Sequence, residues 1–237
     1  MSVIWHDLEC GSYAEDLRFW RELARTQGDP VLDIGAGTGR VALDLCRQGH
    51  RVTALDTDEE LLAELQRRAD GLELETVVAD AREFDLGRRF ALCLMPMQTI
   101  QLLGGHDGRV AFLRCASRHL REDGLLAIAI AEELELYETI DGVPGPLPDI
   151  FERDGIVYSS QPTAVRVDGE QFVLERRREI ITARGERSVD ENVIHLDRLT
   201  RAQLETDAHE AGLRKAGDAT ISATDDYVGS TVVMFSA

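Results

Sequence analysis

The sequence predicts an α/β fold: a seven-stranded sheet with helices on both faces and an inserted antiparallel β-sheet. Three observations lead to this prediction. Strand and helix patterns alternate through the first half of the chain, which is typical of a parallel sheet. Three extended stretches then interrupt the alternation. One helix and two further strands follow them.

The first half begins with a short apolar run, VLDIG at residues 31–35, bounded by glycine as a fully buried strand would be. The next pattern is helical and has Gly49 as its C-terminal stop. A second helix opens with Thr57 and Glu60, the pattern of a capping box. In chain order, we expect strands at 31–35, 51–56, 72–80, 90–96 and 125–131, and helices at 40–49, 57–69 and 108–124.

The pattern changes after Glu132. Residues 141–150 are rich in glycine and proline and are expected to form a loop. Asp168 and Gly169, between the first two extended stretches, indicate a β-hairpin. The expected strands of this region are 156–167, 170–183 and 188–199.

A helix pattern returns at residues 200–213, where Thr200 and Gln203 form a second capping box. Two last strands are expected at 215–221 and 230–237. The chain is therefore predicted to consist of a core, residues 1–140 and 200–237, and an antiparallel insert, residues 141–199.

Composition and charge limit the function classes. The 237 residues are 43% hydrophobic, which is enough to bury a substantial core. The net charge of −18 repels a phosphate backbone, so no nucleic-acid partner is expected. No run of 18 apolar residues and no secretory signal pattern is present, so no membrane span is expected. The four cysteines lack a CxxC pair, which favours buried thiols in a reducing cytoplasm over disulfides or a metal site.

Three glycines follow the first strand at every second position: Gly35, Gly37 and Gly39. A glycine turn that leads into a helix presents free N–H groups to an anion. A triphosphate loop would need a lysine that is absent here, and the dinucleotide fingerprint would need glycine or alanine where Arg40 stands. The remaining candidate anion is the carboxylate of an amino-acid moiety, which fits S-adenosylmethionine.

Three acids stand at the ends of the first three expected strands. Asp56 can accept hydrogen bonds from both ribose hydroxyls, although NAD-binding folds place an acid similarly. Asp80, followed by the small Ala81, suits an exocyclic amine and a flat adenine ring. Asp33 lies where a cationic ammonium would need a partner. Acids at three strand ends suit a ligand with an ammonium and a sulfonium better than a pyrophosphate.

From about Tyr13 to its end, the sequence resembles the class I S-adenosylmethionine-dependent methyltransferases, which have a Rossmann-like fold. VLDIGAGTGR at 31–40, VTALDTDEELL at 52–62 and VVADAREFDL at 77–86 are similar to the first three motifs of the family, in order. FALCLMPMQTIQLL at 90–103 matches the fourth only loosely. The strands inserted after the fifth strand resemble those of small-molecule N- and O-methyltransferases, such as glycine/sarcosine and amino-sugar N-methyltransferases.

The resemblance implies a role for each matching position. The methionine moiety would be held by one acid and the glycines, the ribose by the acid of the second strand, and the adenine by the acid of the third strand with the backbone of Ala81. Met95 to Gln98 would lie beside the methyl group. The implied cofactor-binding set is Tyr13, Asp33, Gly35, Gly37, Gly39, Asp56, Thr57, Asp80, Ala81 and Met95. No metal is implied.

One of these assignments has an alternative, and one of the motifs excludes a subclass. Tyr13 is expected either to close over the cofactor or to pack in the core. Residues 95–98 read MPMQ, and this disfavours the DNA- and protein-glutamine-methylating relatives, which carry an (N/D)PP(Y/F) motif there.

Three polar residues are candidates to act on the substrate. His106 is the best-placed candidate for a base, with a solvated loop histidine as the alternative. Gln98 and Gln101 are candidates to hydrogen-bond the substrate or to cap a loop. The acceptor is expected to be an amine or a hydroxyl of a small molecule.

The sequence leaves the role of the insert and two alternative functions open. The insert is expected to form a lid, a substrate wall or a contact with a second copy of the chain in a homodimer. The alternative functions are a cofactor-binding regulator or partner subunit on the same fold and an NAD-dependent oxidoreductase, which Arg40 and the absence of a catalytic Tyr-x-x-x-Lys disfavour.

Overall fold

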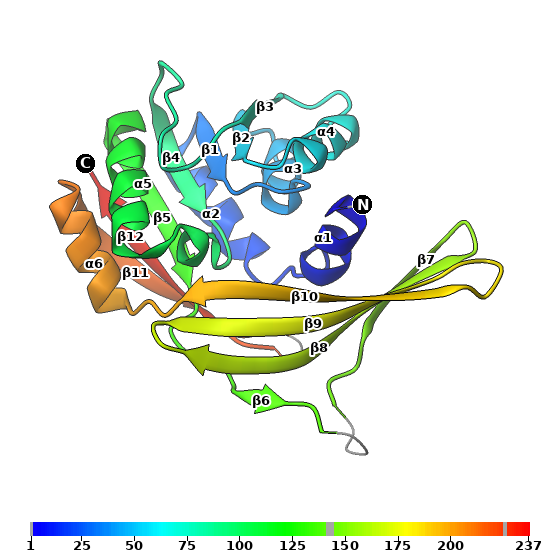
Figure 1. Cartoon of the computed structure of the whole chain (residues 1–237). Helices are drawn as coiled ribbons and strands as arrows, with labels where there is room; N and C mark the ends of the chain where they lie inside the picture. The colour runs from blue at the N-terminus through cyan, green and yellow to red at the C-terminus, as the bar shows by residue number, and fades with distance from the viewer. Residues whose placement is uncertain (1, 141–144, 225–226) are drawn as a thin grey trace. The chain divides into compact units, whose positions relative to one another are not determined.

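The computed structural model describes residues 2–140, 145–224 and 227–237. These residues form two compact units (Figure 1). Residues 13–132 and 199–237 make the first, which we call the core unit, and residues 3–12 and 133–198 make the second, the insert unit. The expected loop at 141–150 lies partly outside the described residues. The predicted α/β fold with an inserted antiparallel sheet is confirmed.

The described core unit contains a seven-stranded sheet in the order β11-β12-β5-β4-β1-β2-β3. β1 to β5 are parallel, while β12 is antiparallel to β5 and β11 is antiparallel to β12. Hence the carboxyl ends of β1, β2, β3 and β4 meet at one edge. The strands are β1 (Val31–Ile34), β2 (Val52–Asp56), β3 (Leu74–Val78), β4 (Phe90–Met95), β5 (Leu120–Ile130), β11 (Arg214–Ile221) and β12 (Ser230–Ser236).

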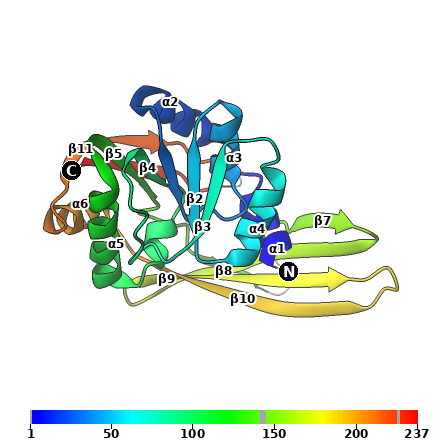
Figure 2. The same cartoon turned by 90° about the horizontal axis from the view of Figure 1, so that it is seen from above.

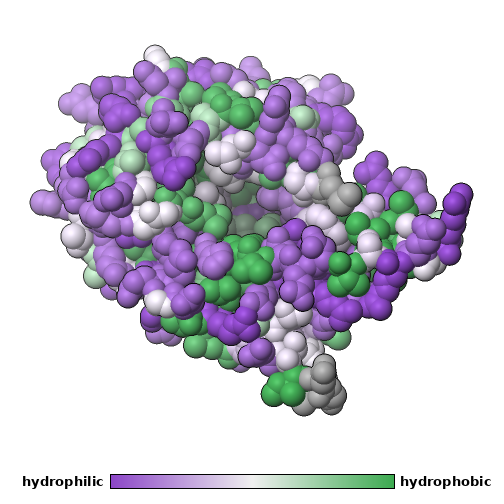
Figure 3. Space-filling model, in the orientation of Figure 1, coloured by the Kyte–Doolittle hydropathy of each residue, from purple (hydrophilic) through white to green (hydrophobic). Residues whose placement is uncertain are grey.

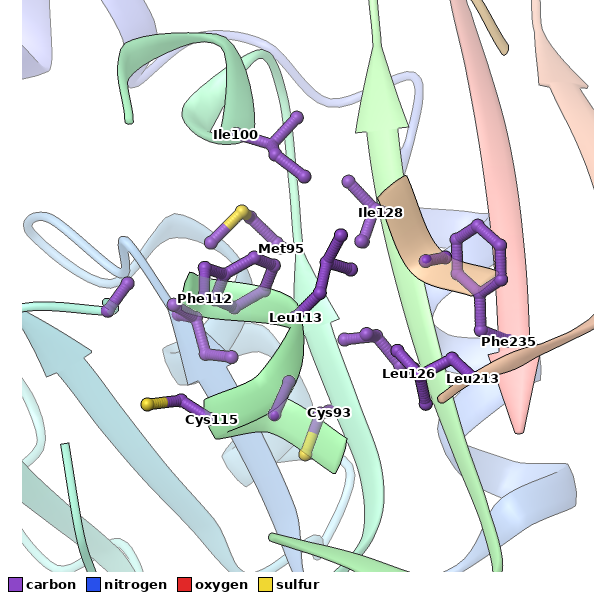
Figure 4. Packing of buried hydrophobic residues seen from close by; sticks show 14 of the residues in the cluster. Cys93, Met95, Ile100, Phe112, Leu113, Cys115, Leu126, Ile128, Leu213 and Phe235 are labelled. Atoms are coloured by element: carbon purple, nitrogen blue, oxygen red, sulfur yellow. The ribbon is translucent and has the colours of Figure 1, made fainter. Parts of the chain in front are cut away.

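Helices cover both faces of this sheet (Figure 2). Successive side chains of a strand point to opposite faces, so Leu32 and Ile34 of β1 join one hydrophobic cluster and Val31 joins the other. The first cluster includes Phe112 of α5 (Figure 4). It also includes Leu204 of α6, whereas the second cluster includes side chains of α2, α3 and α4. The helices are α2 (Leu17–Gln27), α3 (Arg40–Arg47), α4 (Glu59–Arg68), the 3₁₀ helix η1 (Thr99–Leu102), α5 (Gly105–His119) and α6 (Arg201–Glu210).

Two local predictions were wrong. The cap of α4 is Asp58 and not Thr57, because the Asp58 side chain accepts hydrogen bonds from the Glu60 and Leu61 amides. The helix that was expected to run to Gly124 ends at His119, and β5 begins at the next residue. Pairing of Leu120 with Phe90 of β4 draws that segment into the sheet.

The second predicted capping box, at the start of α6, is confirmed. The Thr200 side chain accepts from the Gln203 amide, and the Gln203 side chain accepts from the Thr200 amide. Together these two bonds satisfy two of the donors that a helix start leaves free.

The insert unit is built on an antiparallel sheet in the order β10-β9-β8-β6, with β7 paired to β8. The predicted hairpin at Asp168 and Gly169 is confirmed, since Asp168 pairs with Gln171 across it. Part of the expected loop is instead strand β7. The elements of this unit are α1 (Ser2–Cys10), β6 (Tyr137–Glu138), β7 (Asp149–Arg153), β8 (Ile156–Asp168), β9 (Gln171–Ile181) and β10 (Arg187–Asp197).

Helix α1 packs against this sheet, which the sequence does not indicate. Glu9 receives two hydrogen bonds from Arg178, at 2.8 and 2.7 Å, and one from the Ser160 hydroxyl at 2.7 Å. The ring of Trp5 lies edge-on to Tyr158, with 5.7 Å between the ring centroids. Leu199, expected to end the insert, is 1% exposed and belongs to the hydrophobic cluster of the core unit. The predicted division at 141–199 stays a prediction.

Candidate functional site

The glycine stretch after β1 forms a tight loop that only glycine can build. Gly35, Gly37 and Gly39 have φ angles of +73°, +54° and +89°, in the left-handed region. A Cβ at Gly35 would lie 2.4 Å from the Thr99 Cγ2 atom, and a Cβ at Gly39 would lie 2.0 Å from the Leu65 Cδ1 atom. The loop therefore packs against η1 and α4, and it delivers the chain to the N-terminus of α3.

Asp56 lies at the end of β2 beside this loop. Its Oδ2 atom accepts a hydrogen bond from the Gly37 amide at 2.8 Å, and its Oδ1 atom accepts one from the Asp58 amide at 3.0 Å. Each carboxylate oxygen can accept more than one hydrogen bond. The backbone thus fixes the orientation of the half-buried Asp56 carboxylate, which can still accept hydrogen bonds from the hydroxyl groups of a ligand.

Asp33 is buried within β1, with 1% of its surface exposed. Its Oδ1 atom has no hydrogen-bond partner among the described residues. Burial raises the pKa of Asp33 to about 7, although the nearby charge of Arg40 and the Ala42 amide favour the ionised form. A buried carboxylate oxygen without a partner is costly, so this atom is a candidate contact for a cationic ligand group.

Tyr13 is a second buried group whose polar atom has no partner among the described residues. Its side chain is 4% exposed, and burial raises the pKa of its hydroxyl to about 12. The Arg40 guanidinium lies 5.0 Å from the centre of its ring and donates a hydrogen bond to its carbonyl at 2.9 Å. The hydroxyl is therefore protonated at neutral pH and can donate to a ligand.

A buried ion pair holds Tyr13 against the glycine loop. The Asp16 carboxylate, 1% exposed, accepts from Arg40 Nη2 at 2.7 Å and from the Trp20 indole at 2.8 Å. Arg40 is the first residue of α3, so this pair ties the segment before β1 to the helix that the loop opens. Sequence reasoning missed this role of Asp16 and Arg40, and no short motif signals it.

Asp80 and Ala81 follow β3, but the structure gives the acid a partner of its own. Arg82 donates to the two Asp80 oxygens at 2.9 and 2.6 Å and holds the pKa of Asp80 below its usual range. Arg82 is exposed, so it can yield part of this carboxylate to a ligand. Ala81 is buried in the hydrophobic cluster shared by β4 and α5. An adenine contact at Asp80 and Ala81 stays a prediction.

The segment after β4 has an unusual backbone. Met97 has a φ angle of +56°, which is uncommon for a residue other than glycine and is often found at functional sites. The Met95 side chain is buried in the same cluster as Phe112 and Ile128 (Figure 4). Only backbone atoms of Met95 are thus candidates for a ligand contact.

The two glutamines near this segment differ. The Gln101 side chain is buried and binds both the carbonyl and the amide of Ala131, at 3.1 and 2.9 Å. These bonds fasten η1 to the residue after β5, which matches the capping alternative. Gln98 is half-buried and precedes η1. Of the two, Gln98 stays the candidate for a substrate contact.

His106 lies in the first turn of α5, where α6 supplies two carboxylates to it. Its Nδ1 atom is 2.8 Å from Asp207, and its Nε2 atom is 3.3 Å from Glu210. The hydrogen bond to Asp207 raises the pKa of His106. A histidine whose two ring nitrogens are both engaged by carboxylates is a poor general base, so these contacts oppose the predicted catalytic assignment.

The exposed regions of the core unit include one shallow cavity of about 210 Å³, which lies away from the glycine loop. It is lined by Asp85, Gly87, Arg88, Arg89, Arg118 and His119, and thus by the start of β4 and the end of α5.

In the described part of the chain, no helix is long and apolar enough to cross a membrane.

Comparison with known proteins confirms the resemblance and the fold. Residues 31–124 match a family model described as a methyltransferase domain. A cypemycin N-terminal methyltransferase from a Streptomyces species is 29% identical over 146 residues, which are 62% of this chain and 58% of that protein. The chain spans less than two thirds of the length of this relative and of three further curated relatives that it matches.

Solved structures with similar folds are more distant in sequence. A sugar N-methyltransferase from a Streptoalloteichus species has a TM-score of 0.75 and 17% identity, and the match covers 98% of this chain and 91% of that one. An amino pentose methyltransferase from Micromonospora echinaspora has a TM-score of 0.70 and 22% identity, covering 94% and 92%. At these identities the likeness shows the fold.

Proposed function

We propose that this chain is an S-adenosylmethionine-dependent methyltransferase whose acceptor is an amine of a small molecule or a peptide. The observation that carries the proposal is the Asp33 Oδ1 atom, buried without a partner at the carboxyl end of β1, beside the glycine loop. The α-ammonium of S-adenosylmethionine would supply that partner. A ligand with an anionic pyrophosphate at the same place would instead meet a second negative charge.

Other groups in the core unit fit the same ligand. The Tyr13 hydroxyl, buried and protonated, would donate to the carboxylate of the methionine moiety. Asp56, held by two backbone amides, would accept from the ribose hydroxyls. We assign the adenine to Asp80 and Ala81, and the surroundings of the methyl group to Met95 through Gln98.

When bound, S-adenosylmethionine supplies a methyl group that is already activated on a sulfonium. The residues of the chain then have to orient the acceptor, exclude water and keep the acceptor nitrogen uncharged. Because His106 is engaged by Asp207 and Glu210, no side chain is assigned as a general base. Methyl transfer to a neutral amine depends less on a general base than transfer to a hydroxyl does, which favours an amine acceptor. The names of the N-methyltransferases among the relatives support the same choice of acceptor.

The antiparallel sheet is proposed to bind the acceptor rather than the cofactor. It follows β5, and open α/β sheets bind their ligands at the carboxyl edge. A homodimer in which a second copy covers part of this sheet stays a candidate arrangement.

Calorimetric titration with S-adenosylmethionine, with NADH as the control ligand, tests the cofactor. A turnover assay for S-adenosylhomocysteine release over a panel of amines and hydroxyl compounds tests the reaction. We expect tight binding of the first ligand only, and turnover with amines. Preference for NADH would contradict the cofactor assignment. Cofactor binding without turnover on any acceptor would favour a regulator or partner subunit on this fold.

A further inference from the structure

Three buried side-chain polar atoms lack a hydrogen-bond partner in the described chain: Tyr13 Oη, Asp33 Oδ1 and Asn192 Nδ2. The first two flank the glycine loop of the core unit and are explained above by the cofactor. Asn192 lies in the other unit, on β10 of the antiparallel sheet. Buried polar groups are nearly always paired, so this amide needs an explanation of its own.

The register of the sheet shows what surrounds Asn192. It pairs with Arg176 on β9, and two residues further along β10 Ile194 pairs with Leu174. Leu174 in turn pairs with Val165 on β8, which pairs with Tyr137 on β6. Because side chains alternate between the faces of a strand, these residues lie on one face. We call Tyr137, Val165, Leu174, Asn192 and Ile194 the mixed face.

Arg176, Arg178 and Ser160 lie on the same side of the sheet as the mixed face, and none of their hydrogen bonds involves Asn192. Arg176 donates to the Ser160 hydroxyl at 2.8 Å and pairs with Asp149, and Arg178 pairs with Glu9 of α1. Helix α1 is thus fastened over the row of Ser160 and Arg178. The members of the mixed face are half-buried, neither packed away nor fully solvated.

Structural reasons for an asparagine at this position are weak. Asparagine is depleted in strands. The Arg176 side chain directly opposite is engaged by Ser160 and Asp149, and the next pair along the face, Leu174 and Ile194, is apolar. The opposite face of β10 carries Glu191, Val193 and His195, which are all exposed. An unpaired amide on the half-buried side is therefore a cost to the ligand-free protein.

We propose that the mixed face binds the methyl acceptor and that Asn192 donates a hydrogen bond from Nδ2 to an oxygen of the acceptor. This inference rests on the proposed function and narrows the acceptor to an amine that also carries a hydroxyl or carbonyl oxygen. The apolar side chains would contact the carbon skeleton of the acceptor. The Tyr137 hydroxyl, whose pKa burial raises, stays protonated and is a second donor at the other end of the face.

The first test uses the protein without any ligand. Asn192→Leu replaces a buried, unpaired amide by an apolar side chain with the same number of heavy atoms and the same branching, so we expect the midpoint of thermal unfolding to rise by about 2–4 °C. Glu191→Leu, on the exposed face of the same strand, is the matched control and should change it less. A lower midpoint for Asn192→Leu would show that the chain itself needs this amide, and it would overturn the proposal.

The second test measures ligand binding by calorimetry with two probes, glucosamine and cyclohexylamine. Both are amines on a six-membered ring, and only the first carries hydroxyl groups. We expect the wild-type chain to prefer glucosamine by about tenfold, a difference near the net contribution of one hydrogen bond. Asn192→Leu should lose this preference, whereas Glu191→Leu should keep it.

Titration of the same proteins with S-adenosylmethionine distinguishes a failure of the proposed function from a failure of the inference about Asn192. If the wild-type chain does not bind S-adenosylmethionine, the proposed function fails. If it binds S-adenosylmethionine but shows no preference for glucosamine, or if Asn192→Leu keeps the preference, the inference about Asn192 is wrong. Unchanged S-adenosylmethionine affinity in Asn192→Leu, with the preference lost, supports it.

Discussion

At the residue scale, the acids of the core unit differ in how far the chain itself satisfies them. Asp80 is paired with Arg82, and Asp56 is held by two backbone amides. Asp33 accepts from the Ala42 amide and keeps one oxygen without a partner among the described residues. This order predicts that binding of the cofactor's ammonium group depends most on Asp33 and that binding of its ribose depends most on Asp56.

Asp33 predicts a pH dependence. Its pKa is raised from 3.8 to about 7 by burial, so the folded state holds a proton that the unfolded state loses, and the free energy of unfolding falls as pH rises from about 4 to 7. A bound ammonium favours the ionised form. S-adenosylmethionine affinity should therefore rise between about pH 6 and 7.5, before the α-amino group of the ligand itself loses its proton near pH 8.

Calorimetry across this pH range measures the effect, and Asp33→Asn is the matched variant because it removes the charge at equal volume. The variant should bind S-adenosylmethionine more weakly and should lack the rise in affinity. The same rising profile in both proteins would show that Asp33 does not contact the ammonium.

Asp56 makes a separate prediction. Asp56→Ala should weaken S-adenosylmethionine binding by at least about tenfold, since two charge-assisted hydrogen bonds to the ribose, each worth about 1.5–3 kcal/mol, are lost. Calorimetric affinity close to that of the wild type would falsify the ribose assignment. Asp56→Asn serves as the control, because it keeps one accepting oxygen next to the Gly37 amide.

Residue types at strand ends were predictable, whereas their partners were not. The sequence predicts acids at the ends of β1, β2 and β3 because buried strands and glycine turns have clear patterns. It does not predict that Arg82 pairs with Asp80 or that Asp207 engages His106, because those contacts depend on side-chain conformations and on the packing of α5 against α6.

At the element scale, the start of α4 tests how the chain leaves β2. Asp58→Ala should lower the free energy of unfolding by about 1 kcal/mol, the usual cost of losing an N-cap, and the unfolding midpoint by about 2–4 °C. Thr57→Ala is the matched control, because Thr57 is exposed and does not cap the helix. Thermal unfolding followed by circular dichroism checks both. A larger effect of Thr57→Ala would restore the capping box that the sequence suggests.

Element boundaries were less predictable than element order. The helix of residues 105–119 passes directly into β5, with Leu120 already paired to Phe90, so no glycine or proline marks the change. The capping box of α6 was predictable because its two partners, Thr200 and Gln203, are three residues apart. Local sequence patterns thus identify a helix boundary that is set by contacts between nearby residues. They miss a boundary that is set by pairing with a strand distant in sequence.

At the scale of the whole molecule, charge predicts what the chain does not bind. Acidic residues number 44 against 26 lysines and arginines, and hydrophilic side chains cover most of the face seen in Figure 3. Nucleic-acid affinity depends largely on neutralising phosphates. We expect no gel shift of duplex DNA or transfer RNA at sub-micromolar protein and physiological salt. A shift under those conditions would contradict the small-molecule or peptide acceptor.

The two-unit arrangement was only partly predictable. Alternating strands and helices predict the sheet of the core unit, because each βαβ step is local. The place of α1 was not predictable, since Glu9 binds Ser160 and Arg178, which lie 151 and 169 residues later in the chain and on two different strands. Residues 3–12 thereby join the insert unit, although they are far from it in sequence.

The division of labour between the units can be tested by isolating the core unit. Glu132 accepts a hydrogen bond from the Arg201 amide at 3.0 Å, so the ends at residues 132 and 199 lie close together. A short Gly/Ser linker can therefore join residues 13–132 to 199–237 and keep Leu199 in its hydrophobic cluster. Both hydrophobic clusters lie within these residues, so the shortened chain should fold, which circular dichroism checks.

The folded core unit should bind S-adenosylmethionine within a few-fold of the wild-type affinity, because Tyr13, Asp33, the glycine loop and Asp56 are all retained. It should release no S-adenosylhomocysteine with any amine, because the mixed face is gone. Calorimetry and the turnover assay measure the two properties on the same sample. Turnover by the core unit alone would show that the acceptor does not need the insert unit. Loss of cofactor binding by a folded core unit would show that the insert unit holds both ligands, since every predicted cofactor contact would still be present.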